Sequence, residues 1–438
     1  MAQKMSQFGI PTIGQKLLRR RRRRATLLAR SRTRSTETRV AVFTDTFDEV
    51  NGVAQTYHRL WEYAVRTGKR LDIYCFSDRE EGEERQGRAC IHRLRRVAPL
   101  SYYENLSLEM APNLPLLQAL YASRPHVIHV ASPDVLGFHG SLLARVRRVP
   151  LVGFYHTCLP EYAAHYVRSP RLARFVTRVS WAGVKAFYNR CGLVLATTPA
   201  LGARLKASGL RPPVRVCPGG VDVEAFHPRN RRADASEGRP PVILYVGRIS
   251  VEKNLKWYAD VLQRLRAQGV EFTARFVGDG PYRQELQALL PWAEFTGYLR
   301  GDDLTHAFAS ADVFAFPSRT DTFGNVVVEA MASGLPCVVA DPCGPGETVR
   351  PGVNGFVAPG AEAFAERLAQ LAGQEELRRA MGLRSREMAE GYAWDAIFDE
   401  LWARYEDLHH RRHKLRRRRR WNLRRLRRPL VGSVAPLR

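Results

Sequence analysis

The stretch "FPSRTDTFGNVVVEAMASGLP" (residues 316–336) changes from a strand-like to a helix-like pattern around Gly324. An apolar run at 312–318 leads into it, and small and apolar residues at helical spacing follow the glycine. Asp321 and Glu329 stand on the two sides of that glycine. The stretch therefore predicts a strand, a loop that a ligand can approach closely, and a helix that begins near two carboxylates.

The same strand-then-helix pattern recurs along the chain. Apolar runs are separated by enough residues for crossover helices, which is typical of a parallel sheet. The runs are "RVAVFTD" (39–45), "RLDIYCFS" (70–77), "HVIHVA" (126–131), "VPLVGFYHT" (149–157), "LVLATT" (193–198), "VILYVGR" (242–248), "FTARFVGDG" (272–280), "AEFTGYL" (293–299) and "DVFAFPS" (312–318). The sequence thus predicts an α/β protein with two successive Rossmann-like domains joined by a linker.

Segment boundaries follow from the same pattern. Residues 217–241 are rich in Pro, Gly and charge, which indicates a linker between the two domains. The predicted regions are a basic tail at 1–38, a first domain at 39–217, a hinge at 218–241, a second domain at 242–390, a helix crossing back to the first domain at 391–408, and a second basic tail at 409–438. Helices are expected over 54–67, 254–268 and 394–408.

The net charge of +26 is concentrated at the two ends of the chain. Residues 1–39 carry +11 and residues 409–438 carry +13, so the body between them is nearly neutral. Such tails, disordered or helical, are interpreted as solvated, as binding an anionic membrane surface, or as binding nucleic acid. Nucleic acid is the least favoured of the three, because the body contains no recognised nucleic-acid-binding module.

The seven cysteines indicate a reducing compartment. They form neither a CxxC pair nor a His/Cys spacing typical of a metal site, and their number is odd. No apolar run reaches the roughly 18 residues of a membrane span, and no apolar segment follows the N-terminal arginines as in a secretory signal. We therefore expect a cytoplasmic protein, held at the inner face of the membrane if its tails bind lipid.

A diphosphate at the start of the helix after Gly324 explains both carboxylates of the opening stretch. The first N–H groups of a helix suit an anion. Glu329 lies roughly 7–8 Å farther along the helix, which matches a ribose beyond a phosphate. Asp321 stays in the loop, within reach of another hydroxylated group. The alternative is that both acids are solvated and Gly324 only makes a turn.

Cations are expected beside a diphosphate. The segment "VGRISVEKN" (246–254) follows a predicted strand and supplies Arg248 and Lys253. Arginine can grip a phosphate with two parallel hydrogen bonds, and lysine contributes a point charge. In so basic a chain, an ordinary surface position is the alternative for either residue.

Three further strand exits supply candidate positions. Gly52 lies in "EVNGV", His156 in "FYHTCLPEY" and Gly278 in "VGDGP". A plain turn is the alternative for each glycine, and a hydrogen-bonded or surface histidine is the alternative for His156. No GxGxxG motif precedes a helix, which disfavours a dinucleotide-dependent dehydrogenase.

Four motifs in register resemble family 4 of the retaining glycosyltransferases, which implies the GT-B fold, with two Rossmann-like domains facing a central cleft. They are "EVNGV", "CPGGVDVEAFHP", "YVGRISVEKN" and "PSRTDTFGNVVVEAMASGLP". The resemblance covers residues 40–408. It implies a nucleotide-sugar donor on the second domain and an acceptor on the first, with neither a metal nor another cofactor.

The resemblance also implies roles for particular residues. Arg248 and Lys253 would hold the diphosphate, Glu329 the ribose, and Asp321 and His156 would face the donor sugar. The implied catalytic residues are His156, Asp321, Arg248 and Lys253. The implied donor-binding residues are Gly52, Arg248, Lys253, Gly278, Phe323, Gly324, Asn325 and Glu329.

One position departs from the family pattern, because the first acid is commonly Glu and is Asp321 here. The form "TDTFGNVVxEAMA" resembles the lipid-directed mannosyl- and sulfoquinovosyltransferases, which implies GDP-mannose or a UDP-hexose as donor and a membrane lipid or envelope glycan precursor as acceptor. The alternatives are a sugar-nucleotide epimerase of the same fold and a non-catalytic protein that recruits RNA or membrane through its tails.

Overall fold

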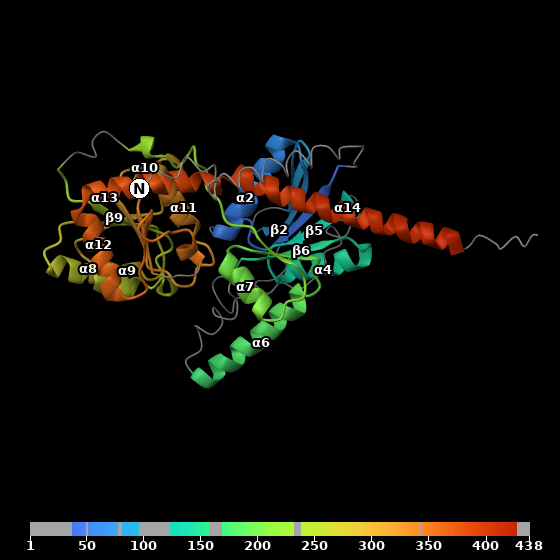
Figure 1. The fold of residues 1–438 in the computed structure, drawn as a ribbon, viewed down its shortest axis with the longest axis horizontal. Coiled ribbons are helices and arrows are strands. Elements are labelled where there is room, and N and C mark those ends of the chain that lie inside the picture. The colour runs from blue at the N-terminus through green and yellow to red at the C-terminus, as the bar shows by residue number, and fades with distance from the viewer. Residues whose placement is uncertain are drawn as a thin grey trace, which may run out of the picture. The chain divides into compact units, whose positions relative to one another are not determined.

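The computed structural model describes residues 37–49, 51–77, 81–95, 123–156, 169–231, 238–340 and 344–426. The described residues from Thr38 onward belong to one compact unit. The N-terminal basic tail and the end of the C-terminal tail lie outside the described residues, so the expectations for them stay predictions. Figure 1 shows how the helices and strands are arranged.

The first half is built on an eight-stranded sheet with the order β3-β4-β2-β1-β5-β6-β7-β8. Its strands are β1 (Arg39–Thr44), β2 (Arg70–Ser77), β3 (Gly82–Gln86), β4 (Ala89–Arg95), β5 (Val127–Val130), β6 (Leu151–Tyr155), β7 (Leu193–Ala196) and β8 (Val214–Val216). All neighbours pair in parallel except β3, which runs antiparallel to β4. The order reverses between β1 and β5, the kind of position where ligands bind in such sheets.

Helices cover both faces of this sheet. They are α2 (Gly52–Thr67), α4 (Val135–Arg147), α6 (Pro170–Tyr188) and α7 (Pro199–Ala207), joined by the C-terminal helix α14 (Trp394–Leu426). Side chains of α4, α6 and α7 share one core with Phe43 of β1, and side chains of α2 and α14 share another core with Val42 of the same strand. Because successive residues of β1 point into different cores, the strand is an unbroken apolar run.

The second half has a six-stranded, wholly parallel sheet with the order β11-β10-β9-β12-β13-β14. Its strands are β9 (Val242–Val246), β10 (Thr273–Val277), β11 (Glu294–Gly297), β12 (Val313–Phe316), β13 (Cys337–Val339) and β14 (Gly355–Val357). Its helices are α8 (Leu255–Ala267), α9 (Arg283–Leu289), α10 (Gly301–Ala309), α11 (Asn325–Ala332), α12 (Ala361–Gly373) and α13 (Glu375–Ala389). The order reverses between β9 and β12, so the exits of these two strands meet.

Short 3-10 helices occur in the connections of both halves. They are η3 (Pro228–Asn230), η4 (Val251–Lys253), η5 (Gly344–Glu347) and η6 (Glu390–Tyr392). The first of them falls within the segment expected to be a linker. The second lies directly before α8 and carries Lys253.

One pair of strands was not predicted, and one expected helix needs correction. The hairpin of β3 and β4 was not predicted, because β3 (GEERQ) is mostly exposed and carries no apolar signal. The helix expected over 394–408 continues to Leu426, because arginine, lysine and leucine favour helix and no glycine or proline interrupts them. Within the described ranges, no helix is both long and apolar enough to cross a membrane.

Candidate functional site

The residues singled out in the second half gather where β9 and β12 end. Lys253, from η4 after β9, donates hydrogen bonds to both carboxylate oxygens of Asp321, at 2.8 and 2.9 Å. The Ser318 hydroxyl, just after β12, also donates to Asp321. The side chains of Lys253 and Asp321 are each only about one-fifth exposed. The ammonium predicted for a phosphate and the carboxylate predicted for a sugar are therefore direct neighbours.

Helix α11 begins beside this ion pair. Gly324 precedes it with a φ of 79°, a left-handed conformation that suits glycine, and the predicted helix start is thus correct to within one or two residues. Asn325 is the first helical residue. The positive end of the helix dipole therefore lies here. The binding of an anion to it stays a prediction. Phe323 differs from the other predicted donor-binding residues, because its side chain is buried in the core of the second half.

Glu329, one turn into α11, is buried and bonded to the first half of the molecule. Its carboxylate accepts a hydrogen bond of 3.0 Å from the Gln55 side chain of α2. The Gln55 oxygen in turn accepts a bond of 3.2 Å from Asn325. Burial raises the pKa of Glu329, and the bond from Gln55 and the charge of Arg59 oppose that rise. Gln55 therefore satisfies a buried carboxylate at the position proposed for a ribose.

Gly52 opens α2 beside the start of α11. A Cβ on Gly52 would lie 3.5 Å from the Asn325 side-chain nitrogen. Gly219, in the hinge, lies closer still, since a Cβ there would come within 2.1 Å of the Asn325 oxygen and 2.5 Å of the Phe323 ring. Glycine at these positions lets three segments from distant parts of the sequence meet at one helix N-terminus.

Arg248 and Gly278 occupy the exits of β9 and β10. Arg248 is exposed, and its main-chain carbonyl accepts a bond from the Tyr245 hydroxyl. Gly278 has a φ of 134°, and a Cβ there would lie 2.0 Å from the carbonyl oxygen of Gly247. The structure thus gives Gly278 a packing role between two strand exits. Its proposed contact with a donor stays a prediction.

His156 follows β6 and begins a buried chain of hydrogen bonds. Its Nε2 bonds the Tyr57 hydroxyl at 3.2 Å, and that hydroxyl bonds Nε2 of His129 at 2.9 Å. The His129 Nδ1 then bonds the Tyr405 hydroxyl of α14 at 2.5 Å. The chain joins α2, β5, β6 and α14, which the sequence alone did not connect.

Both histidines in this series of hydrogen bonds, His129 and His156, are neutral. Burial lowers the pKa of His129 to about 3. Burial, reinforced by the proximity of His129, lowers the pKa of His156 to about 3 as well. A neutral imidazole has one donor and one acceptor nitrogen, so His156 can hold a hydroxyl group by a hydrogen bond but is not a proton-donating imidazolium at neutral pH.

The two halves are also joined at the loop before α11. The Thr322 hydroxyl donates to the main-chain carbonyl of His156, and the Thr197 hydroxyl donates to the Thr322 carbonyl at 2.8 Å. The loop that carries Asp321 is therefore fixed against the exit of β6. The main chain at His156 and the loop that carries Asp321 are therefore neighbours.

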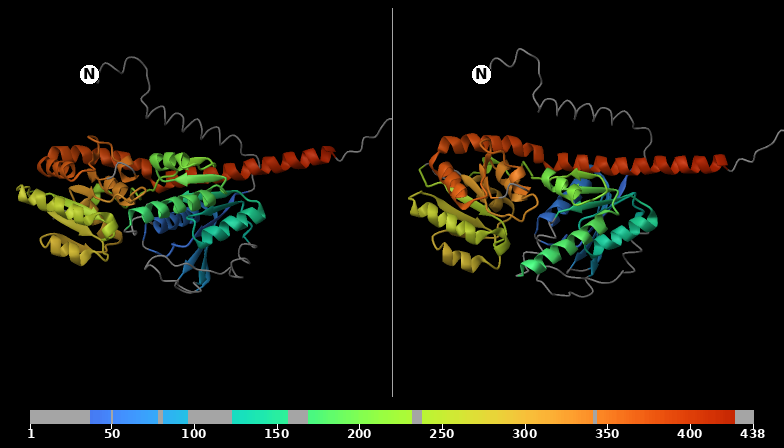
Figure 2. Two further views of the ribbon diagram at one scale, coloured as in Figure 1. Left: turned by 90° about the horizontal axis from the view of Figure 1, so that it is seen from below. Right: turned by 60° about the horizontal axis from the view of Figure 1, so that its bottom comes forward.

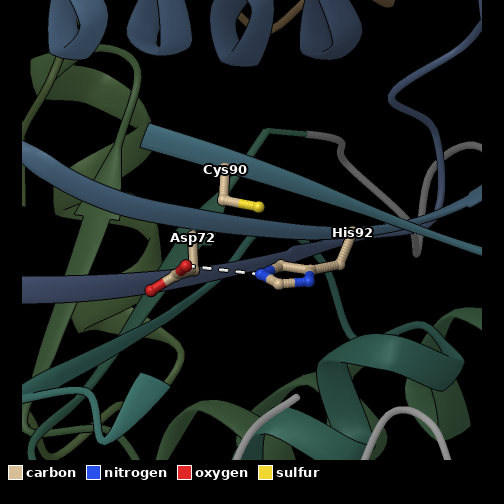
Figure 3. Close-up of side chains that lie close together, drawn as sticks. All are labelled: Asp72, Cys90 and His92. Atoms are coloured by element: carbon tan, nitrogen blue, oxygen red, sulfur yellow. Dashed lines mark hydrogen bonds and ion pairs between the residues drawn. The ribbon is translucent and has the colours of Figure 1, made fainter. Parts of the chain in front are cut away.

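A separate cluster of possible metal ligands lies on β2 and β4 (Figure 3). Asp72 and Cys90 are paired in register, and His92 lies two residues farther along β4. The ring nitrogens of His92 bond Asp72 at 3.3 Å and Glu83 at 2.9 Å. Burial alone would lower the pKa of His92, but the hydrogen bonds to Asp72 and Cys90 outweigh it and raise that pKa to about 9. An imidazolium held between two carboxylates accounts for this arrangement.

Sequence reasoning missed four residues of the site. They are Gln55, Tyr57, His129 and Gly219. The only signal for any of them was the glycine pair after Pro218, which was interpreted as part of the hinge. The others are ordinary helix and strand residues whose importance depends on their partners.

Comparisons with known proteins agree with this architecture. A model of Glycosyltransferase Family 4 matches residues 50–225, and one of Glycosyl transferases group 1 matches residues 240–374. The GDP-mannose-dependent alpha-mannosyltransferase of Mycobacterium tuberculosis is 35% identical over 385 residues, which cover 85% of this chain and 98% of that protein. The sulfoquinovosyl transferase of Arabidopsis thaliana is 33% identical over 380 residues, or 83% of this chain and 72% of that protein.

Solved structures agree on the fold. Sucrose-phosphate synthase from Thermosynechococcus elongatus superimposes with a TM-score of 0.69 at 20% identity, covering 85% of this chain and 99% of that one. Together with the two Rossmann-like halves, each built on a sheet whose strands are mainly parallel, this likeness establishes the GT-B fold. The chain is a glycosyltransferase and belongs to glycosyltransferase family 4.

Proposed function

We propose that this glycosyltransferase moves a hexose from a nucleotide-diphosphate sugar to an acceptor hydroxyl, with retention of anomeric configuration and without a metal. The observation that carries the proposal is the meeting of Lys253, the α11 N-terminus, Glu329 and His156 at the strand exits. We propose that the diphosphate binds to Lys253 and the α11 N-terminus, the ribose to Glu329 and the sugar to His156.

The donor is proposed to bind mainly to the second half. Lys253 has three N–H donors, so it can keep its bond to Asp321 and still contact a phosphate. Arg248 is exposed and lies five residues before Lys253 in the sequence. It is proposed to hold the other phosphate. The ribose hydroxyls would take the place of Gln55 on Glu329. The names of the relatives support GDP-mannose, with a UDP-hexose as the alternative donor.

The transfer itself breaks the bond between the anomeric carbon and the diphosphate oxygen. A new bond forms from the acceptor oxygen to the same face of that carbon, and the acceptor proton passes to the leaving diphosphate. Arg248, Lys253 and the α11 N-terminus supply the positive charge that stabilises this leaving group. Neutral His156 is proposed to orient a sugar hydroxyl.

The acceptor is proposed to be a membrane lipid or an envelope glycan precursor. The alpha-monoglucosyldiacylglycerol synthase of Streptococcus pneumoniae is 26% identical over 68% of this chain, and its name supports a lipid. We propose that the protein works in the cytoplasm, because its five described cysteines are buried and unpaired, and that its basic tails hold it at an anionic membrane. Nucleic acid is a less favoured partner of the tails.

Calorimetric titration with GDP-mannose, UDP-glucose and UDP-sulfoquinovose, in the presence of EDTA, tests the donor site. We expect one nucleotide sugar to bind, and we expect Glu329→Gln to weaken its binding because one charged hydrogen bond to the ribose is lost. Glu362→Gln is the matched control, since Glu362 is an exposed carboxylate of the same half. NMR of the product would then give the anomeric configuration.

Each outcome bears on a different part of the proposal. Binding that needs a divalent cation would refute metal independence, and a product of inverted configuration would refute retention. Release of a free, epimerised sugar without any acceptor would replace the transferase by an epimerase. Binding by none of the nucleotide sugars would refute the donor site.

A further inference from the structure

Two neighbouring helices of the first half carry an unusual share of exposed apolar side chains. Of the ten large hydrophobic residues that are exposed among the described residues, six lie on α4 and α6. They are Phe138, Leu142, Val146, Leu172, Phe175 and Val179, between 52% and 67% exposed, and together they are called the α4/α6 face. Single exposed apolar residues are normal, but six on two helices are not.

The six residues form one stripe on each helix. Leu172, Phe175 and Val179 are spaced i, i+3 and i+7 on α6, which places them on one side of that helix. Phe138 and Leu142 are spaced i and i+4 on α4, and Val146 follows after four more residues. Each helix therefore has two apolar sides, one buried in the core and one facing solvent.

Helices α4 and α6 cover the same face of the sheet (Figure 2). Leu136 of α4 and Val184 of α6 lie in one hydrophobic core beneath the two helices. The helices also touch directly, because the rings of Phe138 and Phe187 meet edge to face with 5.1 Å between centroids. The solvent-facing sides of the two helices thus belong to one surface of the first half.

The charge on these helices has a single sign. Arg171, Arg174 and Arg178 each stand one residue before a member of the α6 stripe, so they line one border of it. Arg145 is exposed on α4 between Leu142 and Val146. Neither Val135–Arg147 nor Pro170–Tyr188 contains an aspartate or glutamate. The surface is apolar and cationic at once.

We propose that the α4/α6 face docks onto an anionic lipid bilayer. An apolar stripe bordered by arginines suits the boundary between headgroups and acyl chains, where side chains insert and cations meet lipid phosphates. A protein partner would need a surface that is both apolar and acidic and that fits two convex helices. A fluid bilayer adapts to that shape and supplies the negative charge.

Helix α6 connects the proposed surface to the site, although its stripe ends nine residues before Tyr188. The Tyr188 hydroxyl, at the end of α6, donates to the main-chain carbonyl of Phe154 at 2.9 Å, and His156 lies two residues farther on. A bilayer at this face would therefore contact the half of the enzyme that carries His156. The inference goes beyond the basic tails and does not depend on which sugar is transferred.

Vesicle flotation of the full chain tests the proposal. The probes are vesicles of phosphatidylcholine alone and of equimolar phosphatidylcholine and phosphatidylglycerol. High salt separates the contribution of the basic tails from that of the apolar side chains. At 1 M salt the screening length falls to about 3 Å, and the tails are then no longer attracted to the anionic lipid. The variants are Leu142→Ser with Phe175→Ser, Arg174→Glu with Arg178→Glu, and Leu383→Ser as the matched control on an exposed leucine of the second half.

We expect binding of the wild type to mixed vesicles to persist in part at high salt. The double serine variant should lose that part, with a fall in partition coefficient of about tenfold or more. The double glutamate variant should bind mixed vesicles less at low salt, and Leu383→Ser should match the wild type. Nucleotide-sugar binding should be equal in all four proteins, which separates this result from a failure of the donor site.

Two results would overturn the inference. One is vesicle binding by the double serine variant that equals the wild type at both salt concentrations. The other is a concentration-dependent dimer of the wild type, seen by ultracentrifugation without lipid and lost in the same variant, because the face would then bind a second copy of the chain.

Discussion

Acidification should destabilise the first half through His129. This histidine is fully buried, and its two ring nitrogens bond the hydroxyls of Tyr57 and Tyr405. Burial holds its pKa at about 3, whereas an unfolded histidine titrates near its ordinary value of about 6.5. Below pH 6.5 His129 binds a proton in the unfolded chain but not in the folded chain, so unfolding is favoured.

The size and direction of the effect follow from the two pKa values. The contribution of His129 to stability is complete above pH 6.5 and is lost as the pH falls toward 3. The loss is about 1.4 kcal/mol for each pH unit, or about 2 kcal/mol between pH 7 and pH 5. His156 has the same direction of shift and should add to the effect.

Two measurements check this prediction. NMR of the protein labelled with ¹³C at histidine, with His129→Gln to assign the resonance, should show no titration of His129 between pH 7 and pH 5. Hydrogen exchange of the β5 amides, corrected for the intrinsic rate, measures their protection. As the pH is lowered, this protection should decrease less in His129→Gln than in the wild type. A His129 resonance that titrates near pH 6.5 would refute the reasoning, because the buried ring would then accept a proton at no cost.

Two further predictions concern the site. Gly219→Ala should lower the free energy of unfolding by about 1–3 kcal/mol, because the new methyl group overpacks against Asn325 and Phe323. Denaturant unfolding measures this loss. The control Gly373→Ala should show no such loss, because nothing lies within 4 Å of its new atom. Lys253→Met should lower kcat/KM for the donor by about 10–100-fold, which corresponds to the loss of one charged hydrogen bond. Steady-state kinetics measures kcat/KM, and an unchanged value would exclude Lys253 from the diphosphate site.

Much of the second half could be predicted from sequence because its buried parallel strands are short apolar runs between helices. The strand expected at 242–248 is Val242–Val246, and the helix expected at 254–268 is Leu255–Ala267. Prediction from apolar runs fails where a strand is buried on one side only or not at all. The exposed strand Gly82–Gln86 is held by its pairing to β4, and no pattern within its own five residues indicates that partner.

The site divides in a similar way. Local patterns made Lys253, Asp321 and Glu329 candidates, because a strand exit followed by a helix is visible in the sequence. The sequence did not predict that Lys253 bonds Asp321, since that contact depends on β9 lying beside β12. Nor did it predict that Gln55, 274 residues away, bonds Glu329.

By itself, the sequence determined the α/β class, the two Rossmann-like halves and the chemical types at the strand exits. These features depend on periodicity and on residue type, which act over a few neighbouring residues. Only the tertiary structure decided which side chains meet, that His156 and His129 are neutral, and that α4 and α6 expose an apolar side. Those properties depend on strand order and burial, which are set by contacts between residues far apart in the chain.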